Sequence, residues 1–139
     1  MTSVQDAYRR STATQWTRVD LLVALYAAAQ RALDACVAAL EQGDMEEWRS
    51  GALRAQKLLL ALLEGIEPEA DGSSGNIRRL LVFCHGCLVQ PSLDACRDAG
   101  RIIGTLHSAF ATIQDEARLL EQRGQIPPLD DPSGRTVVA

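Results

Sequence analysis

Apolar residues recur at intervals of three and four along most of the chain, the spacing that places them on one face of an α-helix. The first run extends from Leu21 to Leu40 and stops before Gly43, a residue typical of helix ends. A second run extends from Trp48 to Leu63, and two more follow after a loop rich in Pro, Gly and Ser. The pattern predicts helices over about residues 17–42, 45–64, 76–90 and 94–123.

Polar residues at the expected positions mark the starts of the first two helices. Thr17 with Asp20, and Asp44 with Glu47, resemble capping boxes, in which two side chains satisfy free backbone N–H groups at a helix start. The connection after residue 42 is so short that the helices on either side should lie antiparallel. Pro91 should end or kink the third helix, because proline removes a backbone donor.

Four amphipathic helices of this kind predict an all-α fold, an antiparallel up-down four-helix bundle over residues 17–124. Residues 1–16 are polar and predict an N-terminal arm with Val4 and Tyr8 as its apolar anchors. Residues 125–139 hold three prolines and no helical period, so they predict a disordered, flexible C-terminal tail.

Composition supports helices and narrows the range of partners. The 139 residues include 20 Ala and 19 Leu but only 4% aromatic residues, a balance that favours helices over sheets. A net charge of −4 without basic runs argues against a nucleic-acid partner. No signal sequence is recognisable, and Arg31 and Asp34 interrupt the longest apolar stretch. We therefore expect a cytoplasmic protein without a membrane span.

The residues that could carry chemistry do not form a recognisable catalytic set. His85 and His107 have no nucleophile or carboxylate nearby in the sequence to define a role. The stretch Gly72-Ser73-Ser74-Gly75 lacks the lysine of a phosphate-binding loop. The sequence therefore predicts neither an enzyme nor a cofactor.

The cysteines are the basis of an alternative hypothesis in which the protein binds a metal or senses thiol oxidation. Cys84 and Cys87 form a CxxC pair, but no second pair completes the four ligands of a zinc site. Buried cysteines on helices commonly act as small apolar residues, so we predict no metal. The alternative hypothesis is a small metal- or thiol-sensing bundle that uses Cys84 and Cys87, with Cys36 or Cys96 as further ligands.

Several short motifs, taken in order, resemble one known family. They are Ala7-Tyr8, Thr17, the run Asp20-Leu21-Leu22-Val23-Ala24-Leu25-Tyr26, the segment Ala39-Leu40-Glu41-Gln42-Gly43-Asp44-Met45, and Arg54-Ala55-Gln56-Lys57-Leu58-Leu59 followed by Leu62. In residue type and spacing they resemble the flagellar secretion chaperone family FliS over about residues 4–123. Leu80-Leu81-Val82-Phe83 stands where the family normally carries Leu-Tyr-Asp-Tyr, so the chain resembles a diverged member.

The resemblance implies a cytoplasmic chaperone that holds the amphipathic C-terminal segment of flagellin on apolar grooves between helices. Covering that segment would prevent premature polymerisation and assist secretion. A different secreted client is the second alternative, and a homodimer is left open. The resemblance also suggests that the arm around Tyr8 covers part of the groove when no client is bound. By motif match, the partner-binding residues would be Tyr8, Leu22, Leu25, Tyr26, Leu58, Leu62, Leu81 and Phe83.

Overall fold

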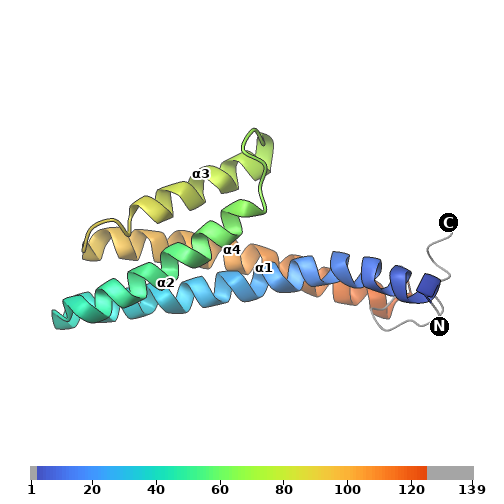
Figure 1. The fold of residues 1–139 in the computed structure, drawn as a ribbon, viewed down its shortest axis with the longest axis horizontal. Helices are drawn as coiled ribbons and strands as arrows, with labels where there is room; N and C mark the ends of the chain where they lie inside the picture. The colour runs from blue at the N-terminus through green and yellow to red at the C-terminus, as the bar shows by residue number, and fades with distance from the viewer. Residues whose placement is uncertain (1–2, 125–139) are drawn as a thin grey trace. The chain divides into compact units, whose positions relative to one another are not determined.

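The computed structural model describes the backbone of residues 3–124 and the side chains of residues 19–120 and 123–124. It contains four helices: α1 (Ser3–Gln42), α2 (Met45–Glu64), α3 (Gly72–Gly86) and α4 (Leu93–Gln122) (Figure 1). No strand occurs within the described residues. The predicted all-α fold class is therefore confirmed.

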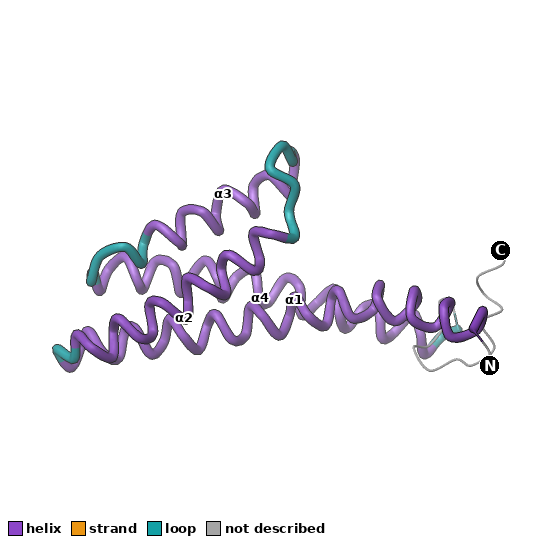
Figure 2. The backbone as a smooth tube through the Cα atoms, in the orientation of Figure 1, coloured by secondary structure: helices purple, strands orange, loops and turns teal. Residues whose placement is uncertain are grey.

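The chain divides into two compact units. One comprises Ala24–Ser108 and is called here the bundle unit, and the other comprises the residues up to Val23 and from Ala109 onward. Within the bundle unit, consecutive helices run in opposite directions and are joined by short loops (Figure 2). This order is the predicted up-down antiparallel arrangement.

Local capping explains why α1 ends and α2 begins where the sequence predicts. Gly43 has a φ of 73°, a left-handed conformation that a residue with a side chain rarely adopts, and it terminates α1. The side chain of Asp44 then accepts a hydrogen bond of 3.0 Å from the backbone N–H of Glu47. The resulting helix α2, Met45–Glu64, coincides with the predicted range.

The start of α1 differs from the prediction. The helix does not begin at Thr17, because α1 is continuous from Ser3. Residues 3–16 contain no proline or glycine, so nothing in them stops a helix that the following apolar stretch has nucleated. Tyr8 is outside the range of residues whose side chains the structure describes. The predicted division into arm, bundle and tail stays a prediction.

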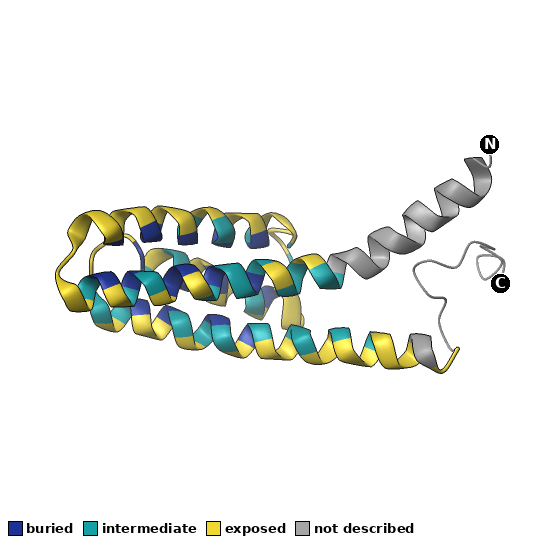
Figure 3. Ribbon diagram, turned by 90° about the horizontal axis from the view of Figure 1, so that it is seen from below, coloured by how far each residue is buried: buried dark blue, intermediate teal, exposed yellow. Residues whose placement is uncertain are grey.

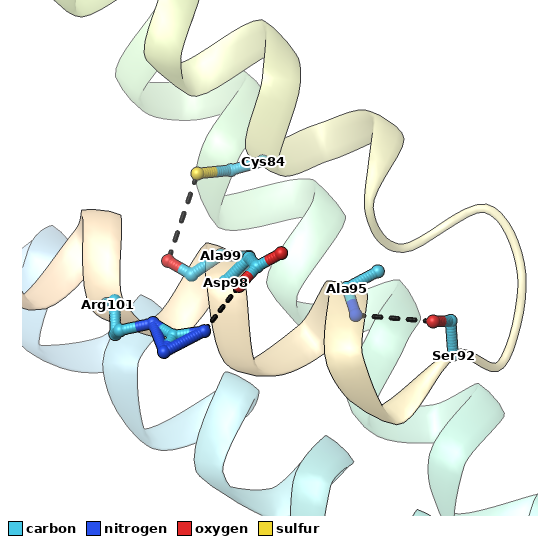
Figure 4. Close-up of polar contacts among 6 residues, drawn as sticks. All are labelled: Cys84, Ser92, Ala95, Asp98, Ala99 and Arg101. Atoms are coloured by element: carbon cyan, nitrogen blue, oxygen red, sulfur yellow. Dashed lines mark hydrogen bonds and ion pairs between the residues drawn. The ribbon is translucent and has the colours of Figure 1, made fainter.

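Helix α3 is shifted towards the N-terminus relative to the predicted range 76–90. Its first turn uses the glycines and serines that follow Asp71, and Gly75 is buried there. It ends at Gly86 because residues 87–89 form turns, before Pro91 excludes further helix. Ser92 then caps α4, as its hydroxyl accepts a hydrogen bond of 3.2 Å from the Ala95 N–H (Figure 4).

The core of the bundle unit is built largely from small and aliphatic side chains. Buried positions follow the inward sides of the helices, while the opposite sides are exposed (Figure 3). The largest fully buried side chains are Tyr26, Leu33, Leu59, Leu62, Leu81, Leu88 and Ile103. Because alanine and glycine fill much of the remaining space, the helix backbones can approach one another closely.

The second unit is held by polar contacts between α1 and α4. The side-chain amide of Gln114 donates a hydrogen bond to Asp20 Oδ1. The guanidinium Nη2 of Arg118 lies 4.0 Å from the same Asp20 oxygen. One carboxylate on α1 therefore contacts two successive turns of α4.

The stretch Val19–Gln42 of α1 is long and apolar enough, by length and composition, to cross a membrane. Its mean hydropathy reaches 1.4 despite Arg31 and Asp34, contrary to the expectation that these charges interrupt it. In the bundle unit, however, this stretch places Tyr26, Ala29 and Leu33 in the core. The same composition therefore serves here to pack one helix against the others.

Candidate partner-binding surfaces

The residues predicted to bind a partner fall into different environments. Tyr26, Leu62 and Leu81 are at most 2% exposed and form part of the core. Leu22, Leu25 and Leu58 are half-buried, whereas Phe83 is 52% exposed. Tyr8 lies outside the described side chains. Only Phe83, among the predicted residues that are described, presents a large exposed surface, and the role of the whole set in binding stays a prediction.

A groove runs between α1 and α4 in the bundle unit. Its volume is about 470 Å³, and its lining combines apolar residues with charged residues of opposite sign on the two helices. It is lined by Gln30, Leu33, Asp34, Val37, Ala38, Glu41, Cys96, Arg97, Gly100 and Arg101. We call this surface the α1–α4 groove.

Both arginines of the α1–α4 groove are already paired. Arg97 on α4 and Glu41 on α1 form an ion pair of 2.7 Å between side chains that are about half exposed. Arg101 pairs with Asp98 one turn away on the same helix (Figure 4). Such exposed pairs contribute little stability, so they can open when a partner enters.

A smaller hollow of about 200 Å³ lies between α3 and α4. It is lined by Leu80, Arg101, Ile102, Thr105 and Leu106. Phe83 follows Leu80 by three residues, so its exposed ring lies on the same side of α3. Sequence reasoning identified Phe83 but missed Leu80 and Ile102. The helical spacing of Leu80 and Ile102 can be read from the sequence. That spacing, however, does not distinguish an apolar residue at a surface hollow from one in the core.

All four cysteines of the bundle unit are free thiols, and all are buried except Cys87, which is half-buried. Burial raises the pKa of Cys36 to about 11 and that of Cys84 to about 12, and it also raises the pKa values of Cys87 and Cys96. The Cys84 thiol donates towards the carbonyl oxygen of Ala99 at 3.8 Å (Figure 4). Thiols held protonated in this way are poor nucleophiles and poor metal ligands.

Metal-ligating side chains do not converge in the described part of the chain. No group of three or more His, Cys, Asp or Glu residues there could hold a metal ion. Together with the raised thiol pKa values, this arrangement gives no support to the metal- or thiol-sensing alternative.

A model of one known protein family matches most of the chain. The family model described as flagellar protein FliS matches residues 1–117, which include α1, α2, α3 and most of α4. No curated protein sequence matches the chain at a significant level. The family consists of flagellar export chaperones and not of enzymes. Because the match spans well over half of its length, this chain belongs to the FliS family.

Proposed function

We propose that this protein is a cytoplasmic export chaperone for flagellin. In this proposal it holds the amphipathic C-terminal segment of flagellin, its client, until secretion. The observation that carries the proposal is the family match over residues 1–117. The client segment forms helix contacts between subunits in the filament, so a cytosolic cover over its apolar face would prevent premature assembly.

The surfaces of the bundle unit support this proposal physically. Its core is complete without a client, since Leu59, Leu81 and Ile103 are fully buried. Leu80 and Phe83 nevertheless remain 38% and 52% exposed beside the hollow between α3 and α4. An amphipathic segment that covers them gains about 25 cal/mol for each Å² of apolar surface removed from water. Ordering the segment offsets part of that gain.

The α1–α4 groove offers the second surface for the same segment. It combines the accessible apolar side chains of Val37 and Ala38 with charged side chains that are exposed and weakly paired. A helix or extended segment is the kind of ligand that such a groove accommodates. A client that spans the groove and the hollow would bury more apolar area than either surface offers alone.

The test is co-elution of the purified protein with the C-terminal segment of flagellin from the same organism. A complex is expected at concentrations of about tens of micromolar, corresponding to binding free energies of roughly −6 kcal/mol or better. The double substitution Leu80→Asp with Phe83→Asp should abolish the complex. Leu53→Asp, which also places a charge at an exposed apolar position but on the outer side of α2, should not. Absence of a complex would count against the proposal, and capture of another secreted protein instead would favour the alternative client.

A further inference from the structure

Helix α2 carries two stripes of residues with helical spacing. The inner stripe is buried and consists of Trp48, Ala52, Ala55, Leu59 and Leu62. The outer stripe consists of Arg49, Leu53, Gln56, Lys57 and Leu60. Leu53 is 53% exposed and Leu60 is 47% exposed. Their spacing of seven residues is that of a helix-packing seam, yet no described element covers them.

Gln56 shows that the outer stripe borders α3. Its side-chain amide donates a hydrogen bond of 3.5 Å to the carbonyl oxygen of Leu88, just after the end of α3. Leu53 and Leu60 lie about one turn to either side of Gln56 on the same side of α2. Val89, the residue after Leu88, is 66% exposed. Apolar side chains from both sides of the α2–α3 junction therefore reach the surface.

Val82 extends this surface along α3. Leu80 marks the edge of α3 that faces α4, because it lines the hollow with Ile102 and Leu106. Val82 is two residues further on, which is about 200° around the helix, so it lies on the opposite edge, towards α2. It is 48% exposed. We call Leu53, Leu60, Val82 and Val89 the outer patch.

Basic residues without acidic partners accompany the outer patch. Arg49 and Lys57 lie on the outer stripe, and Arg78 precedes Val82 by one turn. In the described part of the chain none of the three forms an ion pair, and the Arg78 Nε atom is buried without a hydrogen-bond partner. The arginines of α4 at positions 97, 101 and 118 each have a carboxylate within 4.0 Å.

The surface around the outer patch is therefore basic, although the chain as a whole has a net charge of −4. The acidic residues of α2 lie towards its two ends, at Glu46, Glu47 and Glu64, and leave its central turns basic. An apolar surface bordered by unpaired basic groups is complementary to an apolar stripe bordered by carboxylates.

We propose that the outer patch binds an acidic amphipathic helix of a second protein. The helix would pack apolar side chains against Leu53, Leu60 and Val82 and pair its carboxylates with Arg49, Lys57 and Arg78. Leu53 and Leu60 are separated by about 10 Å along α2, so a helix of three to four turns covers the patch. The outer patch is separate from the α1–α4 groove and from the hollow between α3 and α4. The partner and a client are therefore able to bind together, and this proposal does not rest on the identity of the client.

The test uses two synthetic helical peptides of about 18 residues that share one leucine stripe. One peptide has glutamates along both edges of the stripe, and the other has lysines in the same positions. Titrated into the ¹⁵N-labelled protein, the acidic peptide should shift the amide resonances of residues 53, 60, 82 and 89. It should bind about tenfold more tightly than the basic peptide, with an affinity that falls as salt is added. Shifts confined to the α1–α4 groove, or equal affinities for the two peptides, would overturn the proposal.

Charge reversal provides the matched variants. Arg49→Glu with Lys57→Glu, at exposed positions, should invert the preference so that the basic peptide binds more tightly. Arg97→Glu with Arg101→Glu, in the α1–α4 groove, should leave the preference unchanged. A concentration-dependent dimer that Leu53→Glu converts to monomer would assign the patch to self-association and would also overturn the proposal.

Discussion

Gly51 on α2 faces Cys36 on α1 so closely that a Cβ atom at position 51 would lie 3.1 Å from the Cys36 sulfur. Both residues are buried, and the same Cβ would lie 3.6 Å from the carbonyl oxygen of Ala32. The distance between the two helix backbones at this point therefore depends on a residue with no side chain.

Gly51→Leu should destabilise the bundle unit by about 1–3 kcal/mol, because the new side chain must displace Cys36 or separate the helices. Urea unfolding followed by circular dichroism measures the change. Gly86→Ala is the control, since nothing lies within 4 Å of its Cβ position, and the helix preference of alanine should leave stability unchanged or raise it by up to about 1 kcal/mol. Equal losses in the two variants would contradict the assigned contact.

The cap of α2 leads to a second prediction. Asp44→Ala removes the acceptor for the Glu47 N–H and should cost about 1 kcal/mol. Asp71 occupies the same cap position of α3 but makes no side-chain cap hydrogen bond, so Asp71→Ala should cost little. Thermal unfolding of the two variants at pH 7 tests the difference, and a larger loss from Asp71→Ala would contradict it.

The buried thiols should make stability fall in alkaline solution. Burial raises the pKa of Cys36 to about 11 and that of Cys84 to about 12 from an ordinary value of 9.0. Above pH 9 the unfolded chain loses these protons while the folded chain keeps them, so the unfolded state binds fewer protons. The free energy of unfolding should therefore fall by roughly 1 kcal/mol per pH unit for each thiol between pH 9 and the folded pKa.

Urea unfolding at several pH values between 8 and 10.5 measures this slope. The contribution is complete below pH 9 and is lost as the pH rises towards 11 for Cys36 and towards 12 for Cys84. Cys84→Ala should make the slope shallower even though it lowers stability at every pH. A slope identical to that of the unaltered chain would show that Cys84 ionises equally in both states.

Substitutions of Leu81 and Phe83, which lie within one turn of α3, should affect stability and partner binding differently. Leu81 is fully buried, so Leu81→Ala should cost about 2–5 kcal/mol. Phe83 is 52% exposed, so Phe83→Ser should change stability by less than about 1 kcal/mol while weakening capture of the flagellin segment about tenfold. Melting temperature and co-elution, measured on both variants, test the two expectations. A severe loss of stability in Phe83→Ser would place that ring in the core instead.

Much of the fold was predictable because helix signals are local. Gly43 ends α1 and the Asp44 carboxylate caps the start of α2, and both effects involve only residues close by in the sequence. The boundary between α1 and α2 was therefore predicted correctly. The start of α1 was not, because a capping pattern such as Thr17 with Asp20 marks a helix start only if the preceding residues leave the helix. The shift of α3 has a similar cause: Gly75 is buried, and packing outweighs the low helix preference of its first turn.

The candidate surfaces were less predictable, because the same spacing describes an apolar residue in the core and one at the surface. Leu62 and Leu81 were predicted to bind a partner and are buried, whereas Leu53 and Leu80, which were not in the predicted set, are exposed. The sequence by itself determined the all-α fold class, the order of the helices and the family, since these follow from local periodicity and from short motifs. Only the tertiary structure decided which stripe of each helix is buried, which grooves remain open and which arginines lack a partner. Those properties depend on the distances between helices, which no local pattern encodes.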